Sequence, residues 1–137
     1  MSPETRKHAG ILIIILPTVI YGGISILQFL INDPAYIQNP LRQDLFRAGH
    51  AHPGVLLILS LVALLYVDEA NLSKGWKRIV SSFIPASAIF LPAAFFFSVL
   101  KADATEPNGL INLAYAGVFF LVIGLLALGI GLLRKKK

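Results

Sequence analysis

Two of the three histidines of this chain, His50 and His52, stand in the stretch FRAGHAHPG, close to Arg47 and Gly54. A neutral imidazole can ligate haem iron, copper or zinc. An arginine nearby can pair with a haem propionate, and a glycine lets a flat macrocycle come close to the backbone. These residue types predict a cofactor or metal site, whose geometry depends on the conformation of the segment.

The spacing of the two histidines leads to a different site in each conformation. In an extended segment, residues two apart point to the same side, so His50 and His52 could chelate one ion. In a helix the two lie ~200° apart about the axis, and only one of them can face a given ligand. Arg47, His50 and Gly54 then share a helix face, which favours a haem bound on that face.

Further polar residues that could complete the site follow residue 100. Glu106 could hold a catalytic zinc ion together with His50, His52 and water. Asn108, Asn112 and Tyr115 follow i, i+4, i+7 spacing and form one polar stripe on a helix. Because lipid cannot satisfy such a stripe, it should face protein or a water-filled cavity. We expect it to form hydrogen bonds between helices or to border the cofactor.

Two other interpretations of the histidine pair stay open. Polar and aromatic residues at the outer end of a membrane span commonly serve as interfacial anchors and helix caps, without any ligand. Histidine also changes charge near neutral pH, so the pair could sense pH.

The elements that position these residues are long apolar runs. The chain has 137 residues, of which 56% are hydrophobic and only 14% are charged, whereas soluble domains carry roughly 25% charged residues. Four stretches contain no Asp, Glu, Lys or Arg: 8–32, 48–67, 79–100 and 107–133. Each reaches the ~20 residues that a membrane helix needs. We therefore predict an all-α polytopic membrane protein, a single-domain four-helix transmembrane bundle with spans near 9–31, 48–67, 79–100 and 108–133.

The residues before the second span decide which conformation the histidines adopt. Asn39-Pro40 is typical of a helix start, with Asn as the cap and Pro in the first position. This predicts a long helix from Pro40 that kinks around Gly49–Gly54, because Pro53 cannot donate a backbone hydrogen bond. The alternative is a loop that continues to His52, with Pro53 opening the helix.

The basic residues predict the orientation in the membrane. If both termini share a side, that side holds nine of the 12 Lys and Arg residues, namely Arg6, Lys7, Lys74, Lys77, Arg78 and residues 134–137. The other side holds Arg42, Arg47 and Lys101. The positive-inside rule then predicts cytoplasmic termini, a location in the bacterial inner membrane, and histidines at the outer face. Because basic residues cluster at the ends of apolar runs, we expect a lipid bilayer as partner and no nucleic acid.

Several kinds of chemistry are disfavoured by what the sequence lacks. There is no cysteine, which excludes disulfides, thiolate metal sites and cysteine-ligated iron–sulfur clusters. The chain has no glycine-rich phosphate-binding loop. The spans contain no carboxylate, which argues against a proton-driven transporter with an acidic relay.

The motif Arg47-x-x-His50-x-His52 resembles the Arg-x-x-His-x-His signature found at a helix end in haem–copper oxidase-like membrane proteins, including the nitric-oxide-response haem–copper family. The resemblance implies that His50 or His52 is a haem or copper ligand and that Arg47 is its supporting charge. The chain as a whole resembles small four-span bacterial membrane proteins.

Three functions are consistent with these features. The first is a bundle that binds haem or a divalent metal ion, copper or zinc, at its outer end and is redox-linked or sensory. The second is a structural or accessory subunit of a larger membrane complex, whose histidines only cap a helix. The third is a small carrier or a homo-oligomeric pore lined by the Asn108–Tyr115 stripe. We identify no catalytic residues.

Overall fold

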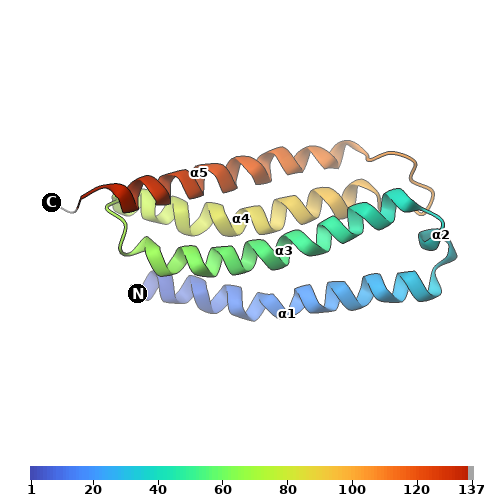
Figure 1. Ribbon diagram of the computed structural model, residues 1–137, viewed down its shortest axis with the longest axis horizontal. Coiled ribbons are helices and arrows are strands. Elements are labelled where there is room, and N and C mark those ends of the chain that lie inside the picture. The colour runs from blue at the N-terminus through green and yellow to red at the C-terminus, as the bar shows by residue number, and fades with distance from the viewer. Residues whose placement is uncertain (136–137) are drawn as a thin grey trace.

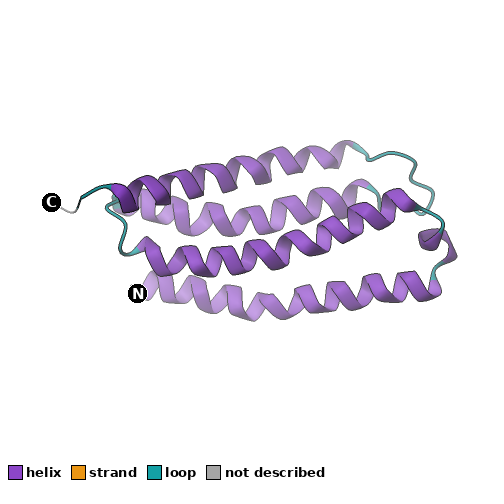
Figure 2. Ribbon diagram, viewed as in Figure 1, coloured by secondary structure: helices purple, strands orange, loops and turns teal. Residues whose placement is uncertain are grey.

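The computed structural model describes residues 1–135, which form helices joined by short loops and contain no strand (Figure 1, Figure 2). The α-helices are α1 (Pro3–Asn32), α2 (Pro34–Ile37), α3 (Pro40–Val67), α4 (Lys74–Ser98) and α5 (Leu113–Leu133), and a 3₁₀ helix η1 (Gly109–Asn112) leads into α5. Within this part of the chain, four helical segments are long and apolar enough to span a membrane, η1 and α5 counting as one. The predicted all-α, four-helix fold of a multi-pass membrane protein is confirmed.

The long helices lie side by side in chain order and alternate in direction (Figure 1). α4 packs extensively against both α3 and α5, whereas α1 packs on α3 and barely touches α4. Both ends of the described chain lie at one end of the bundle, as predicted, and α2 and the loop before η1 lie at the other. We call these the terminal end and the opposite end.

The first turns of three long helices are capped by side chains that the sequence supplies. Ser2, Asn39 and Ser73 each accept a hydrogen bond from the backbone N–H three residues further on. Pro40 takes the first position of α3, and the helix then runs through Pro53. The predicted long helix is therefore confirmed, and the alternative of a loop up to His52 is wrong.

The helices extend beyond the spans predicted from the uncharged stretches. α1 begins at Pro3 rather than near residue 9, and α4 begins at Lys74 rather than Ile79. Charged residues mark the edges of the hydrocarbon layer, whereas caps mark the ends of helices, so the two boundaries differ by one to two turns. The last predicted span, 108–133, also differs from the structure, because residues 109–112 form a 3₁₀ helix before α5 begins.

Glycines let α5 lie close to its neighbours. Gly117, Gly124 and Gly131 are buried and recur every seven residues on one face of α5. A Cβ at Gly124 would lie 2.6 Å from Cγ1 of Ile84 in α4, and one at Gly131 would lie 2.6 Å from Cγ of Leu72. Small residues at a repeated position are typical of membrane helices whose backbones approach closely.

Candidate functional site

The two motif histidines lie against different neighbours because the segment that carries them is helical. The His50 ring lies against α1, where a Cβ at Gly23 would come within 2.8 Å of its Nε2. The His52 ring packs on Phe95 of α4, with ring centroids 5.0 Å apart. The expectation that both imidazoles chelate one ion from an extended segment is therefore wrong.

The imidazole of His52 is held by a backbone carbonyl. Its Nδ1 lies 2.7 Å from the carbonyl oxygen of Ala48, one turn earlier in α3. Because a carbonyl oxygen only accepts, Nδ1 carries the proton in the neutral ring and Nε2 keeps a free lone pair. A histidine that ligates a metal commonly donates its other ring N–H to a backbone carbonyl in this way. His52 is thus oriented like a ligand, with Nε2 unbonded among residues 1–135.

The imidazole of His50 fills a recess on the surface of α1. A Cβ at Gly22 would lie 3.7 Å from its Nδ1, and both ring nitrogens lack a hydrogen bond within the described chain. One turn further along α3, a Cβ at Gly54 would lie 3.6 Å from Cγ1 of Val19. α1 therefore covers the face that His50 and Gly54 share. The geometry does not fit a macrocycle on this face, contrary to the prediction from the helical spacing.

Arg47 lies at the surface of the bundle, one turn before His50 in α3. Its Nη1 is 3.6 Å from Oδ1 of Asp44, and its Nη2 donates to Oε1 of Gln43 at 3.1 Å. The side chains of Arg47 and Asp44 are 58% and 77% exposed, so this ion pair contributes little to stability. Arg47 is therefore accessible to a ligand from outside the chain.

The other predicted site residues lie away from the histidines. Glu106 is in the exposed loop between α4 and η1, and Asn112 donates to the carbonyl of Gly109 at 3.0 Å. The side chain of Tyr115 is 77% exposed rather than turned toward protein. α5 packs mainly on α4 and only slightly on α3, which separates Asn112 and Tyr115 from α3. An outward tyrosine near a span end is typical of the membrane interface.

The structure does not assemble the predicted zinc ligands in one chain. Over residues 1–135, no three His, Asp or Glu side chains come close enough together to hold a metal ion. His50, His52 and Glu106 therefore do not form a common site within a single molecule, and a metal bound there would need donors from a second chain.

A buried arginine at the opposite end was not singled out by the sequence. Arg42 is 6% exposed, and its Nε donates to the carbonyl of Val99 at 3.2 Å. Its guanidinium carbon lies 5.6 Å from the ring centre of Tyr36 and 5.3 Å from that of Phe46. Arg42 thereby joins α2 and α3 to the end of α4. The i, i+4 spacing of Arg42 and Phe46 was the available signal, because it puts the cation beside an aromatic ring.

Tyr36 forms the other wall of this cluster and is completely buried. Burial raises the pKa of its hydroxyl, although the charges of Arg47 and Arg42 act in the opposite direction. Tyr36 therefore stays neutral at physiological pH. It acts on Arg42 through its ring and not as a counter-ion.

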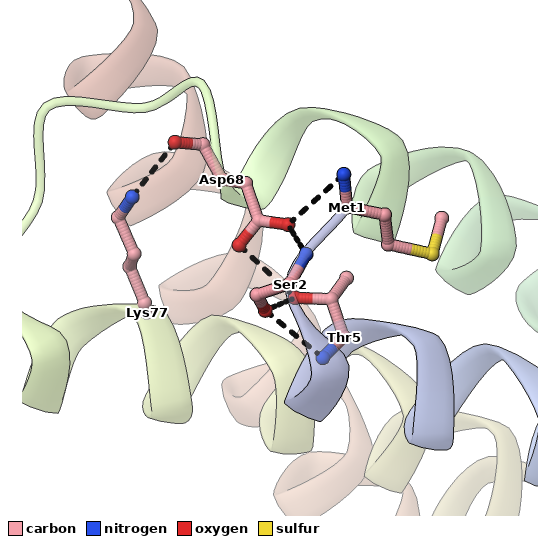
Figure 3. A network of polar contacts seen from close by, with 5 residues as sticks. All are labelled: Met1, Ser2, Thr5, Asp68 and Lys77. Atoms are coloured by element: carbon pink, nitrogen blue, oxygen red, sulfur yellow. Dashed lines mark hydrogen bonds and ion pairs between the residues drawn. The ribbon is translucent and has the colours of Figure 1, made fainter.

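At the terminal end, Asp68 ties the start of α1 to the end of α3 (Figure 3). Its Oδ2 accepts from the backbone N–H of Ser2 at 2.5 Å and lies 3.9 Å from the amino group of Met1. Its Oδ1 accepts from the hydroxyl of Thr5 at 3.1 Å, and its backbone carbonyl accepts from Nζ of Lys77 at 2.8 Å. Burial raises the pKa of the carboxyl, but the bonds from Ser2 and Thr5 outweigh it and hold the pKa below its ordinary value.

No protein-family model matches this chain, and no match was found among curated proteins or solved structures. The arguments on function therefore rest on the geometry described above.

Proposed function

We propose that this is a haem-binding membrane protein in which His52 would hold the haem iron. The supporting observation is the bond of 2.7 Å from Nδ1 of His52 to the Ala48 carbonyl, which leaves Nε2 free. A single oriented imidazole can be enough for haem, because the porphyrin supplies the equatorial nitrogens. Zinc and copper need several protein ligands, which residues 1–135 of one chain do not bring together.

The surroundings of His52 are compatible with an apolar macrocycle. Val55, one turn further on the same side of α3, is 65% exposed. His52 itself is half-buried, with Phe95 supporting one side of its ring. Both histidines fall within the uncharged stretch 48–67, so a group bound to Nε2 would border the hydrocarbon layer. Haem bound there would supply one-electron redox or gas-binding chemistry, and the Ala48 carbonyl and Phe95 would orient the imidazole.

The proposal includes the location and the assembly of the protein. We place it in the bacterial inner membrane with both ends of the described chain in the cytoplasm, because seven of the ten basic residues between 1 and 135 lie at the terminal end. His52 then lies in the outer half of the membrane. A homo-oligomer would allow the His52 of a second copy to hold the same haem. The alternatives of an accessory subunit and of a carrier or pore stay predictions, which no contact within residues 1–135 favours.

The test is haem binding by the full chain in detergent, with the two motif histidines compared. Haemin added to the wild-type protein should produce a Soret band with a stoichiometry of one haem per chain or per two chains. His52→Ala should abolish this band. His50→Ala is the matched control, since it removes an imidazole from the same motif but from the face covered by α1, and it should retain the band.

Three results would contradict the proposal. These are a wild-type protein that binds no haem, a His52→Ala variant that binds it as well as wild type, and a protein that instead carries stoichiometric copper or zinc.

A further inference from the structure

The terminal end of the molecule has a cavity of about 560 Å³ between α1, the end of α3 and the first turns of α4. Its cationic lining residues are Lys74, Lys77 and Arg78, which are spaced i, i+3, i+4 and so lie on one face of α4. Its acidic lining residues are Glu4 and Asp68. We call this cavity the basic hollow.

The carboxylates neutralise these cations only in part, since two carboxylates face three cations. Asp68 directs its carboxylate to the start of α1, and Lys77 donates to its backbone carbonyl instead. Arg78 lies 3.6 Å from Glu4, but both side chains are more than half exposed. Lys74 has no ion pair with any residue between 1 and 135. The hollow therefore keeps positive charge available to an anion.

An apolar groove of about 360 Å³ continues from the basic hollow into the membrane-spanning region. Ser81 lines both cavities, which makes them adjacent. The groove exists because α1 packs against α3 and makes few contacts with α4. Its apolar walls include Ile11, Ile15, Leu57, Pro85 and Ile89. A ligand that enters from the basic hollow would therefore contact charged side chains first and the apolar groove beyond them.

His8 lines the groove on the side of the terminal end. Its Nδ1 is buried and has no hydrogen-bond partner in the described part of the chain. Because the chain alone buries this atom, it does not face the groove, and His8 borders the groove through the rest of its ring.

We propose that the basic hollow and the groove together bind one anionic phospholipid of the inner leaflet. Its phosphate lies beside Lys74, Lys77 and Arg78, its glycerol–ester region is level with His8, and one acyl chain occupies the groove. Basic pockets between membrane helices on the cytoplasmic side are known binding places for anionic headgroups. The charge favours phosphatidylglycerol over zwitterionic phosphatidylcholine. The basic hollow lies at the other end of the bundle from Arg47, and the groove extends from it as far as Pro53 of α3.

The test is native mass spectrometry of the full chain in detergent with dioleoyl phosphatidylglycerol or dioleoyl phosphatidylcholine added. Wild type should retain one phosphatidylglycerol and prefer it about tenfold. Replacing Lys74, Lys77 and Arg78 by Gln should remove this preference. The matched control replaces Arg6, Arg134 and Lys135 by Gln; it removes the same charge at the same end, outside the hollow, and should keep the preference.

A second variant tests the groove separately from the charge. Ala86 lines the groove, so Ala86→Phe should fill it and weaken binding of the dioleoyl lipid while sparing dihexanoyl phosphatidylglycerol. Circular dichroism checks that each variant is folded. The proposal is overturned if wild type binds both lipids equally, if the control loses the preference as fully as the test variant, or if a second copy of the chain occupies the groove instead.

Discussion

At the scale of single residues, the direction of each side chain decides its chemistry. His50 and His52 are two residues apart in α3, yet the ring of His50 packs against α1 and the ring of His52 packs against α4. The carbonyl of Ala48 sets the tautomer of His52, whereas His50 is positioned by two glycines of α1. The same motif therefore holds one imidazole oriented by a hydrogen bond and one that packs on a neighbouring helix.

Arg42 is predicted to stabilise the opposite end through its bond to Val99 and its contacts with two aromatic rings. Arg42→Leu removes these interactions and should lower the free energy of unfolding by about 2 kcal/mol. The control is Arg47→Leu, whose side chain is 58% exposed and whose loss should cost less than about 0.5 kcal/mol. Reversible unfolding in mixed micelles measures both. Equal losses would refute the role given to Arg42.

The lowered pKa of Asp68 predicts that the stability of the protein depends on pH. Its pKa in the folded chain lies below the ordinary value of 3.8, so the unfolded chain takes up the proton first as pH falls. The stabilisation is therefore complete well above that value and is lost as pH falls through the folded pKa. Asp68→Asn should be less stable than wild type at pH 7, and the difference should shrink toward about pH 3. A melting-temperature difference that is the same at both pH values would contradict this.

At the scale of the elements, the sequence predicted the one helix start with a recognised cap better than what the helix faces contact. Asn39-Pro40 correctly indicated the start of α3, because capping is local chemistry. In the Asn108–Tyr115 stripe, Asn108 makes the expected bond to another helix, donating to the carbonyl of Phe97 in α4 at 3.0 Å. Tyr115 is exposed instead, because helical spacing shows that residues share a face but not which neighbour the face meets. Arg42 was overlooked for the same reason, since its partners Tyr36 and Val99 come from other elements.

The glycines of α5 give a prediction with an internal control. A Cβ at Gly124 would lie 2.6 Å from Cγ1 and 3.3 Å from the backbone nitrogen of Ile84, so α4 and α5 must separate to admit it. Gly124→Ala should destabilise the protein by about 1–3 kcal/mol. Gly129→Ala meets nothing within 4 Å and should be neutral or slightly stabilising, since alanine favours the helix. Thermal unfolding in detergent compares the two, and similar melting temperatures would count against the close α4–α5 contact.

At the scale of the whole molecule, the number of spans and the shared side of the termini could be predicted from the sequence. Both follow from the cost of charge in lipid, which depends only on residue type and position along the chain. The open arrangement, in which α1 contacts α3 but barely α4, could not be predicted. It depends on packing between helices, and it produces the groove beside the basic hollow.

The central claim is that four crossings put the Arg47–His52 motif across the membrane from the two ends of the described chain. The chain has no cysteine, so single cysteines can be placed without background. In intact cells, Asp44→Cys and Glu106→Cys should react with a membrane-impermeant maleimide, and Gly75→Cys and Lys135→Cys should react only after permeabilisation. Labelling of all four from the same side would contradict the account.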